Sequence, residues 1–327
     1  MNITGGELLR LENLKVYYYT MDGLVRAVDG IDFYMGMGET VGLVGESGSG
    51  KSTLGLSILK LVPPPGRIVD GRILFKGVDL VELSEDEMRR IRGKHISLVF
   101  QDPATSLNPL MKIGDHIVET ILAHENVSRD EAVRRAYTLL EDVGILPERF
   151  NDYPHQFSGG MRQRAMIALA LALKPDLVIA DEPTSALDVI VQHQILELMK
   201  KLREAYGMGM ILITHDISIA SEIADKIALM YAGHLVEYSD TGSFFEEPLH
   251  PYAEALLKAV PNIQLSDQKL RYIPGMPPDL INPPSGCRFH PRCSYATSIC
   301  REKEPPKLEV RREGFVRCFR YVSRDSL

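Results

Sequence analysis

The sequence predicts an α/β fold with a largely parallel sheet, and three observations carry this prediction. Residues 45–53 match the pattern G-x-x-x-x-G-K-[ST], which binds phosphate groups in proteins. An apolar strand is predicted before this loop, at residues 40–44, and a helix after it, at residues 51–62. The apolar segments 177–180 and 210–214 have the length and composition of buried parallel strands.

The loop at residues 45–53 has the chemistry of a nucleotide phosphate site. Its glycines allow backbone N–H groups to converge on an anion, and the following helix directs its positive end to the same place. Lys51 can reach the β- and γ-phosphates, and the Ser52 hydroxyl can bind Mg²⁺. A Gly/Ser-rich turn that carries a lysine by chance is the alternative, and the flanking strand and helix argue against it. The predicted nucleotide-binding residues are Gly45, Glu46, Ser47, Gly48, Ser49, Gly50, Lys51, Ser52 and Thr53.

Composition limits the class of protein. A chain of 327 residues is long enough for two domains, and its net charge of −7 disfavours a nucleic-acid partner. The longest apolar run, residues 165–173, is too short for a transmembrane helix, which needs about 20 residues. Since the N-terminal residues show no signal peptide, we expect a cytoplasmic protein.

Two N-terminal strands are predicted, at residues 8–19 and 27–35. The first contains Tyr17, Tyr18 and Tyr19, and at least one of three consecutive aromatic side chains must face a second surface. Plain β-propensity is one explanation for these aromatic residues. The other is a surface that stacks on a nucleotide base, for which the position of Tyr18 is the most suitable.

The middle of the chain alternates strands with helices. A strand expected at residues 96–100 ends in Gln101-Asp102-Pro103, a polar and proline-broken segment typical of functional loops. We expect the other elements of this part at residues 71–75 (strand) and at residues 84–92, 113–124 and 129–143 (helices).

A second glycine-containing segment precedes an apolar helix expected at residues 161–173. Ser158 stands where a helix N-cap belongs, and Gly159 and Gly160 leave the backbone amides of the first turn accessible. A simple cap explains Ser158 alone. It does not explain the two glycines followed by the polar turn at residues 162–164.

Acidic and imidazole side chains follow the two buried parallel strands. Asp181 and Glu182 are adjacent carboxylates at a strand end, which is unfavourable unless they serve a cation and a proton. Open α/β sheets bind their ligands at this edge. Asp188 opens a helix expected at residues 189–204, and His215 could reach a phosphate, although a lone histidine is usually structural. The closing strands are expected at residues 227–230 and 234–237.

These motifs, in this order, resemble the ATP-binding-cassette family over residues 8–240. The segment from Ser158 reads S-G-G-M-R-Q, where the commonest form of the family has S-G-G-Q-Q-Q. The resemblance implies a cassette with a phosphate-loop core and a mostly parallel sheet. It also implies an N-terminal antiparallel β subdomain and a helical subdomain at about residues 102–160.

In that family two cassettes close head to tail, with ATP between the phosphate loop of one and the Ser158 segment of the other. The resemblance therefore implies that Ser158, Gly159 and Gly160 serve the ATP held by the partner, and that Asp188 links the two sites.

Within one cassette the resemblance implies a separate role for each remaining residue. Glu182 is the general base for the attacking water, and His215 contacts the γ-phosphate as a switch. Tyr18 stacks on adenine, and Lys51 holds the phosphates together with the loop amides. The residues implied to serve Mg²⁺ are Ser52, Gln101 and Asp181.

A narrower resemblance is to the ATPase subunits of oligopeptide and dipeptide importers. It implies peptide uptake at the cytoplasmic face of the membrane, with a second ATPase subunit (a paralogue or a second copy) and two permease subunits as partners. A substrate-binding protein is implied indirectly. Relatives in this branch also carry oligosaccharides or nickel, so these remain alternatives. The segments that carry the resemblance are residues 101–109, 248–252, 273–278 and 286–293.

All four cysteines lie in an extension expected at residues 241–327, after a cassette at residues 1–240. Disulfides are disfavoured in the cytoplasm, and incidental core cysteines would not be confined to one segment. The spacing C-x5-C-x6-C-x17-C is looser than that of most structural zinc sites and suits an iron–sulfur cluster. The importer branch is similar in carrying a 4Fe-4S cluster here, and zinc remains the alternative. We expect Arg288, Arg292 and Arg317 to offset the negative charge of the cluster ligands Cys287, Cys293, Cys300 and Cys318.

Two other classes compete with an importer ATPase. A cassette protein that acts on ribosomes or DNA typically joins two cassettes or carries basic surface, and this chain has one phosphate loop and a negative charge. An iron–sulfur redox protein would need a second redox centre or a flavin motif, and the sequence contains neither.

Overall fold

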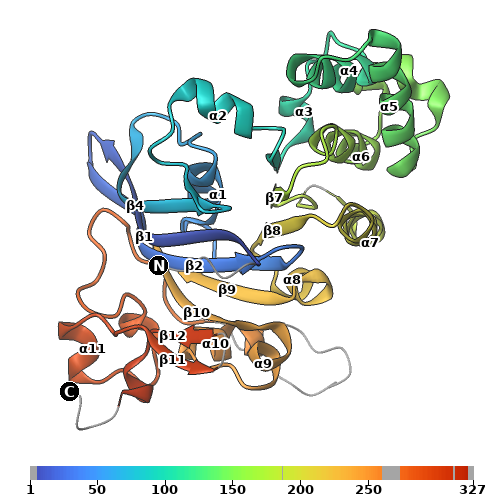
Figure 1. The fold of residues 1–327 in the computed structure, drawn as a ribbon. Coiled ribbons are helices and arrows are strands. Elements are labelled where there is room, and N and C mark those ends of the chain that lie inside the picture. Colours follow the sequence, from blue (N-terminus) through green and yellow to red (C-terminus); the bar gives the residue numbers. More distant parts are fainter. Residues whose placement is uncertain (1–5, 186, 260–272, 312–313, 323–327) are drawn as a thin grey trace. The chain divides into compact units, whose positions relative to one another are not determined.

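A computed structural model describes residues 6–185, 187–259, 273–311 and 314–322 (Figure 1). The chain divides into two compact units. Within the described residues, unit 1 is drawn from residues 1–8, 35–40 and 82–213, and unit 2 from residues 9–34, 41–81 and 214–327. Each unit is described by itself below.

Unit 1 contains three parallel strands in the order β6, β7, β8. They are β6 (Ile96–Val99), β7 (Leu177–Asp181) and β8 (Gly209–Thr214). All of β8, and all of β7 except Asp181, is buried, as expected for parallel strands with a continuous apolar composition. Because parallel strands end at one edge of a sheet, Gln101 and Glu182 follow the ends of neighbouring strands.

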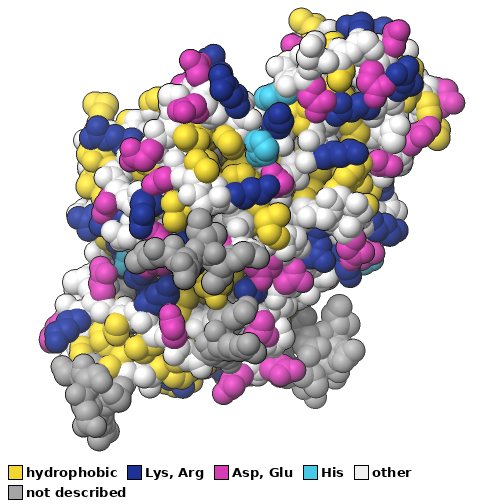
Figure 2. Space-filling view, viewed as in Figure 1, with side chains coloured by type: hydrophobic (Ala, Val, Ile, Leu, Met, Phe, Trp, Pro, Cys, Tyr) yellow, Lys and Arg dark blue, Asp and Glu magenta, His cyan; other side chains and the backbone are white. Residues whose placement is uncertain are grey.

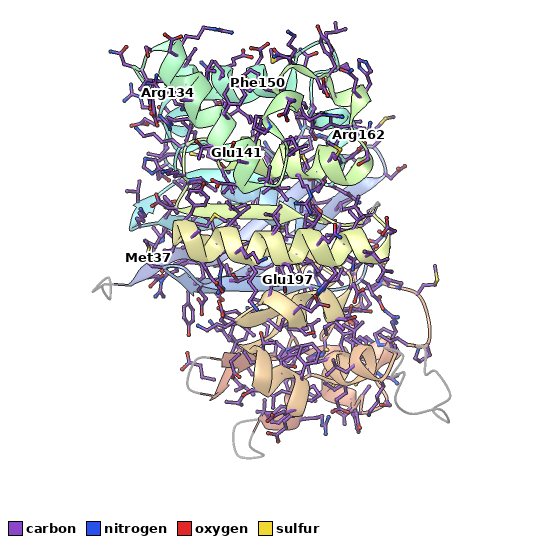
Figure 3. The ribbon with its side chains drawn as sticks, turned by 90° about the vertical axis from the view of Figure 1, so that its right-hand side faces the viewer. Met37, Arg134, Glu141, Phe150, Arg162 and Glu197 are labelled. Carbon is purple, nitrogen blue, oxygen red and sulfur yellow. The ribbon has the colours of Figure 1, made fainter. Side chains whose placement is uncertain are left out.

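Within unit 1, the helices formed by residues 103–170 pack against one another (Figure 1) and bury apolar side chains between them. Phe150 is buried, stacks on Tyr137 with 4.4 Å between ring centroids, and turns inward among the helices (Figure 3). Gly114 makes room for this ring, because a Cβ atom there would lie 2.4 Å from it. The helices of unit 1 are α2 (Glu85–Ile91), α3 (Pro103–Ser106), α4 (Ile113–His124), α5 (Arg129–Asp142), α6 (Gly159–Ala170) and α7 (Val189–Tyr206).

Unit 2 contains an antiparallel sheet in the order β2, β1, β4, β5 and five further strands in the order β11, β12, β10, β9, β3. The antiparallel sheet agrees with the β subdomain implied by the sequence. Its strands are β1 (Glu7–Thr20), β2 (Gly23–Gly36), β4 (Gly66–Phe75) and β5 (Val78–Asp79). The others are β3 (Thr40–Val44), β9 (Lys226–Tyr231), β10 (His234–Asp240), β11 (Leu308–Arg311) and β12 (Gly314–Val316), with β3 parallel to β9 and the remainder antiparallel.

Residues after 240 share the core of unit 2 with residues before it. β12 pairs with β10 through Glu237↔Val316 and Tyr238↔Phe315. One buried apolar cluster joins Val44 of β3 to Tyr252 and Phe289 of the later segment. Figure 1 shows this segment, in orange and red, next to β10. The helices of unit 2 are α1 (Lys51–Ile58), α8 (Ile217–Ile223), α9 (Thr241–Glu246), α10 (Pro251–Ala259) and α11 (Ser298–Glu302).

Two predicted helices have different bounds in the structure. Helix α1 ends at Ile58 instead of residue 62, because Lys60 adopts a left-handed conformation with φ 50°. Helix α6 occupies Gly159–Ala170 instead of residues 161–173. None of the described helices is both long and apolar enough to cross a membrane. Acidic and basic side chains alternate over the face of the described residues in Figure 2.

Candidate functional site

The phosphate loop of unit 2 joins β3 to α1, and its shape requires glycine at two positions. Gly45 has φ 153°, and a Cβ atom there would lie 2.1 Å from the carbonyl oxygen of Met230. Gly50 has φ 101°, and a Cβ atom there would lie 1.9 Å from the carbonyl oxygen of Ala27. No other residue type fits either contact, so the loop depends on these glycines.

Lys51 and Ser49 give this loop the polar groups of an anion site. Lys51 is buried, and its Nζ donates to the carbonyl oxygens of Gly45 at 2.8 Å and Glu46 at 3.0 Å. Ser49 Oγ is buried and has no hydrogen-bond partner among the described residues. Buried polar atoms normally have partners, so this hydroxyl is suited to receive a ligand. The residues present therefore fit a bound phosphate group.

Glu46 is fixed in this loop by residues from the C-terminal segment. Its backbone N–H donates to the Tyr252 hydroxyl at 2.9 Å. Its carboxylate accepts two hydrogen bonds from Arg292, at 2.7 and 3.0 Å. These partners lie 206 and 246 residues away in the sequence, and neither contact was predicted. No local pattern in the sequence signals a pair at this separation.

The three consecutive tyrosines of β1 have three different environments. The Tyr17 hydroxyl donates to Asp29 at 2.6 Å, and Arg67 lies over the ring of Tyr19 at 4.2 Å. Tyr18 places its hydroxyl 3.3 Å from Thr53 Oγ1, in the first turn after the phosphate loop. Tyr18 is therefore the tyrosine beside the loop.

In unit 1, Gln101 and Glu182 meet at the ends of β6 and β7. Gln101 Nε2 donates to Glu182 Oε2 at 3.5 Å. Asp181 is the last residue of β7, and the backbone N–H of Glu182 bonds to the carbonyl oxygen of Ile213 at 2.9 Å. Glu182 has φ 45°, a left-handed conformation that is costly for a residue with a side chain. Two carboxylates and an amide thus stand at one sheet edge.

Ser158 and Asp188 are helix caps. Ser158 Oγ accepts from the Met161 N–H at 3.3 Å, which confirms the predicted cap of α6. A Cβ atom at Gly160 would lie 2.6 Å from Val191 Cγ1, so α6 approaches α7 closely at this point. Asp188 Oδ1 accepts from the N–H groups at both residues 190 and 191, at 3.1 and 3.0 Å.

His215 directly follows β8 and is exposed. The next residue, Asp216, caps α8 by accepting from the Ser218 N–H at 2.9 Å. This cap is the sequence signal of a helix that sequence analysis did not predict. Ala186, between Ser185 and Asp188, lies outside the described residues.

The four cysteines line one cavity of about 390 Å³ in unit 2, together with His250 and Phe289. All four are free thiols, so the disulfide alternative is excluded in this structure. Burial raises the pKa of Cys287 to about 12 and that of Cys318 to about 11, and it lowers the pKa of His250 to about 3. Among the described residues, no three His, Cys, Asp or Glu side chains form a group that could hold a metal ion.

The arginines next to these cysteines, which were predicted to offset a cluster charge, do not line the cavity. Arg288 pairs with Asp29, and Arg292 pairs with Glu46. Arg317 donates to the carbonyl oxygen of Gly30 at 3.0 Å. A buried guanidinium needs acceptors, and these arginines find them in the N-terminal strands and the phosphate loop. Arg320 alone among the arginines lines the described cavity.

Two parts of the chain match known families. Residues 28–185 match the ABC transporter family, and residues 236–300 match the C-terminal region of oligopeptide/dipeptide transporters. The oligopeptide transport ATP-binding protein OppD of Bacillus subtilis (strain 168) is 50% identical over 95% of this chain and 88% of its own length. OppD of Escherichia coli (strain K12) is 44% identical over 96% of this chain and 94% of its own length.

Solved structures of ABC transporter cassettes are also similar to this chain. A dimeric structure of MJ0796, a bacterial ABC transporter cassette, has a TM-score of 0.65 and is 30% identical, covering 72% of this chain and 99% of that chain. A dimeric post-hydrolysis state of that cassette, bound to ADP and Pi, has a TM-score of 0.64 and is 29% identical, with the same coverage.

Proposed function

This chain belongs to the ABC transporter family, in the branch of oligopeptide and dipeptide ATP-binding proteins, and we propose that it hydrolyses ATP to drive peptide import. One observation carries the proposal: a folded phosphate loop and a peptide-transporter C-terminal region occur together in one chain. The names of the relatives favour peptides over oligosaccharides or nickel as cargo.

The location and partners follow from this function. The chain works at the cytoplasmic face of the cell membrane, bound to two permease subunits and a second ATPase subunit. A substrate-binding protein delivers the peptide. Residues 1–240 form the cassette, with the helical subdomain at about residues 102–160, and residues 241–327 form the extension.

Peptide uptake in living cells tests the cargo. Cells that lack the gene should fail to take up a labelled tripeptide. The wild-type gene should restore uptake, whereas Lys51→Ala should not, because it removes the phosphate-binding amine. Nickel and labelled oligosaccharide uptake are measured in the same cells. Loss of either of these with peptide uptake intact would overturn the peptide assignment.

The phosphate loop holds the nucleotide. Lys51, the loop amides and Ser49 bind the phosphates, which is supported by the buried lysine and the unpartnered Ser49 hydroxyl. Tyr18 stacks on adenine, supported by its place beside Thr53. Mg²⁺, when bound, neutralises charge on the phosphates. The residues that would hold it are Ser52, Gln101 and Asp181.

Hydrolysis needs a base and a group that senses the γ-phosphate. Glu182 takes a proton from the attacking water at a carboxylate oxygen, and Gln101, which bonds to that carboxylate, orients it. The left-handed backbone of Glu182 supports this role, because strain of this kind persists where geometry matters. His215 contacts the γ-phosphate, so that the site responds to its loss.

A second cassette completes the site. Ser158, Gly159 and Gly160 present the N-terminus of α6 to the ATP of the partner, and a helix N-terminus attracts an anion. Asp188 links the two sites from the cap of α7. The dimeric state of the similar MJ0796 structure supports this arrangement.

The permease docks on the helical part of unit 1. A groove of about 700 Å³ is lined by α4 and the loop before it, including Leu110, Met111 and Leu122. Leu110 and Leu122, which are 87% and 37% exposed, both line this groove, and exposed apolar side chains that gather in one place mark interaction sites. The occupant is a short cytoplasmic helix of the permease, and the polar loop at residues 101–109 connects this groove to the hydrolytic residues.

The cysteine cavity holds a 4Fe-4S cluster. Four sulfurs around about 390 Å³ suit a group larger than a single ion. A single zinc would need its sulfur ligands about 2.3 Å from one point. Zinc remains the alternative that metal analysis would detect.

A further inference from the structure

The C-terminal segment contacts the phosphate loop directly, through a pair that the proposed mechanism does not use. The two terminal nitrogens of Arg292 each donate a hydrogen bond to the Glu46 carboxylate, Nη1 to Oε2 at 2.7 Å and Nη2 to Oε1 at 3.0 Å. The Arg292 side chain is 6% exposed and that of Glu46 is 23% exposed, so solvent screens this pair only weakly. The geometry is bidentate, the strongest form of an arginine–carboxylate contact.

Aromatic residues hold Arg292 in this position. Its guanidinium lies 5.8 Å from the ring centroid of Tyr231, and it donates to the Tyr231 hydroxyl at 3.3 Å. Tyr231 in turn packs edge-on against Tyr252 at 4.7 Å. Tyr252 accepts the backbone N–H of Glu46, so one aromatic cluster fixes both the backbone and the side chain of this loop residue.

The negative charge of Glu46 is unfavourable next to a site that binds phosphate groups. The loop directs N–H groups and Lys51 toward a polyphosphate, and a free carboxylate one residue after Gly45 would repel that ligand. A paired carboxylate does not, because the guanidinium cancels its charge. The Glu46 carboxylate should therefore weaken ATP binding when Arg292 is absent.

We infer that Arg292 is a positioning residue of the nucleotide site, which cancels the charge of Glu46 and, with Tyr252, holds the first turn of the phosphate loop. The inference rests on the proposed function, since it requires ATP to bind at this loop. It also gives the C-terminal segment a part in nucleotide binding, independent of whatever the cysteines hold.

The test removes the positive charge alone. Arg292→Gln in the full chain should raise the dissociation constant for AMP-PNP, and KM for ATP, by about tenfold, the effect of one uncompensated charge near a polyphosphate. The rise should shrink in high salt, which screens this repulsion. kcat should change much less than KM, because Arg292 acts on binding through Glu46. Adding Glu46→Gln should recover most of the affinity, since no carboxylate is then left to repel the ligand.

Arg317→Gln is the matched control. Arg317 also precedes a cysteine and bonds to the N-terminal strands, but its partners lie outside the phosphate loop. Its affinity for AMP-PNP should stay within about twofold of wild type, because no charge near the phosphates changes.

Three outcomes would overturn the inference. Arg292→Gln could bind AMP-PNP as wild type does. The loss of AMP-PNP affinity could persist when Glu46→Gln is added to Arg292→Gln, which would indicate that the C-terminal segment had merely unfolded. The Arg317→Gln control could show an equal loss. Wild-type protein that fails to bind AMP-PNP would instead overturn the proposed function.

Discussion

Replacing Arg288 with methionine would leave the buried carboxylate of Asp29 in unit 2 without its cationic partner. The Arg288 side chain is 4% exposed, pairs with Asp29 and donates to the carbonyl oxygen of Ala232. Burial alone would raise the pKa of Asp29, but His234, Tyr17 and Arg288 together outweigh it and hold that pKa well below its usual range. Methionine keeps much of the apolar volume of arginine and removes only its charge and donors.

The expected loss of stability is large at neutral pH. Removing one partner of a buried ion pair costs about 3–5 kcal/mol, and we expect about 3 because Tyr17 still donates to Asp29. At about 2.1 cal/mol/K of unfolding entropy per residue, this lowers Tm by about 4 °C for 327 residues. A depressed carboxyl pKa stabilises the fold above the unfolded pKa of about 3.9. The difference between variant and wild type should therefore be full at pH 7 and shrink only below about pH 4, as the pH falls from the unfolded pKa toward the depressed pKa of folded Asp29.

Thermal unfolding at pH 7 and at about pH 3, below the unfolded pKa, measures this difference. Arg134→Met is the matched control, because Arg134 forms an exposed pair with Glu131 on α5 (Figure 3) and should cost less than about 1 kcal/mol. Asp29→Asn added to Arg288→Met should recover part of the loss. An equal loss at both pH values, with no recovery in the double variant, would refute the reasoning.

Three further predictions concern the proposed function. Glu182→Gln should keep ATP binding and cut hydrolysis by about 10²–10⁴, the usual effect of removing a positioned base; near-normal phosphate release would reject Glu182 as the base. A cysteine at Ser106 should crosslink to a permease loop in the assembled transporter, and crosslinks found only to the other ATPase would reject the groove. Anaerobically purified protein should be brown, with an absorbance near 400 nm and about four irons per chain, and Cys318→Ser should bleach it. One zinc and no iron would establish the alternative.

Local signals predicted much of the fold. Helix α4 occupies Ile113–His124 as expected, because its apolar residues follow the helical period. Ser84 caps α2 with Glu87, and Ser158 caps α6, as short-range patterns indicate. The strand, the loop and the start of the helix around Lys51 could be placed because glycines mark the loop, whereas the prolines after residue 62 predicted the end of the helix too late. The agreement between the predicted and observed elements does not establish the roles of the individual site residues. Those roles stay predictions.

Contacts between distant parts of the chain could not be predicted. β12 has only three residues and forms because β10 offers its edge, so no sequence period identifies it. The arginines beside the cysteines suggested a role in balancing a cluster charge. In the structure they pair with distant residues instead. Arg292, for example, pairs with Glu46, which lies 246 residues away in the sequence. The amino-acid sequence shows that each buried guanidinium needs a hydrogen-bond acceptor. Only the folded structure shows which residue supplies that acceptor.

The pairing of β12 with β10 has a practical consequence for shortened versions of the chain. Glu237 and Tyr238 of β10 pair with Val316 and Phe315 of β12, and Arg317 N–H bonds to the carbonyl oxygen of Val236 at 2.9 Å. A fragment cut after residue 240 would leave these backbone groups as an open edge, next to an uncovered Tyr238. Such edges recruit strands from other molecules and begin aggregation. A recombinant cassette that remains in solution should therefore retain the chain through β12.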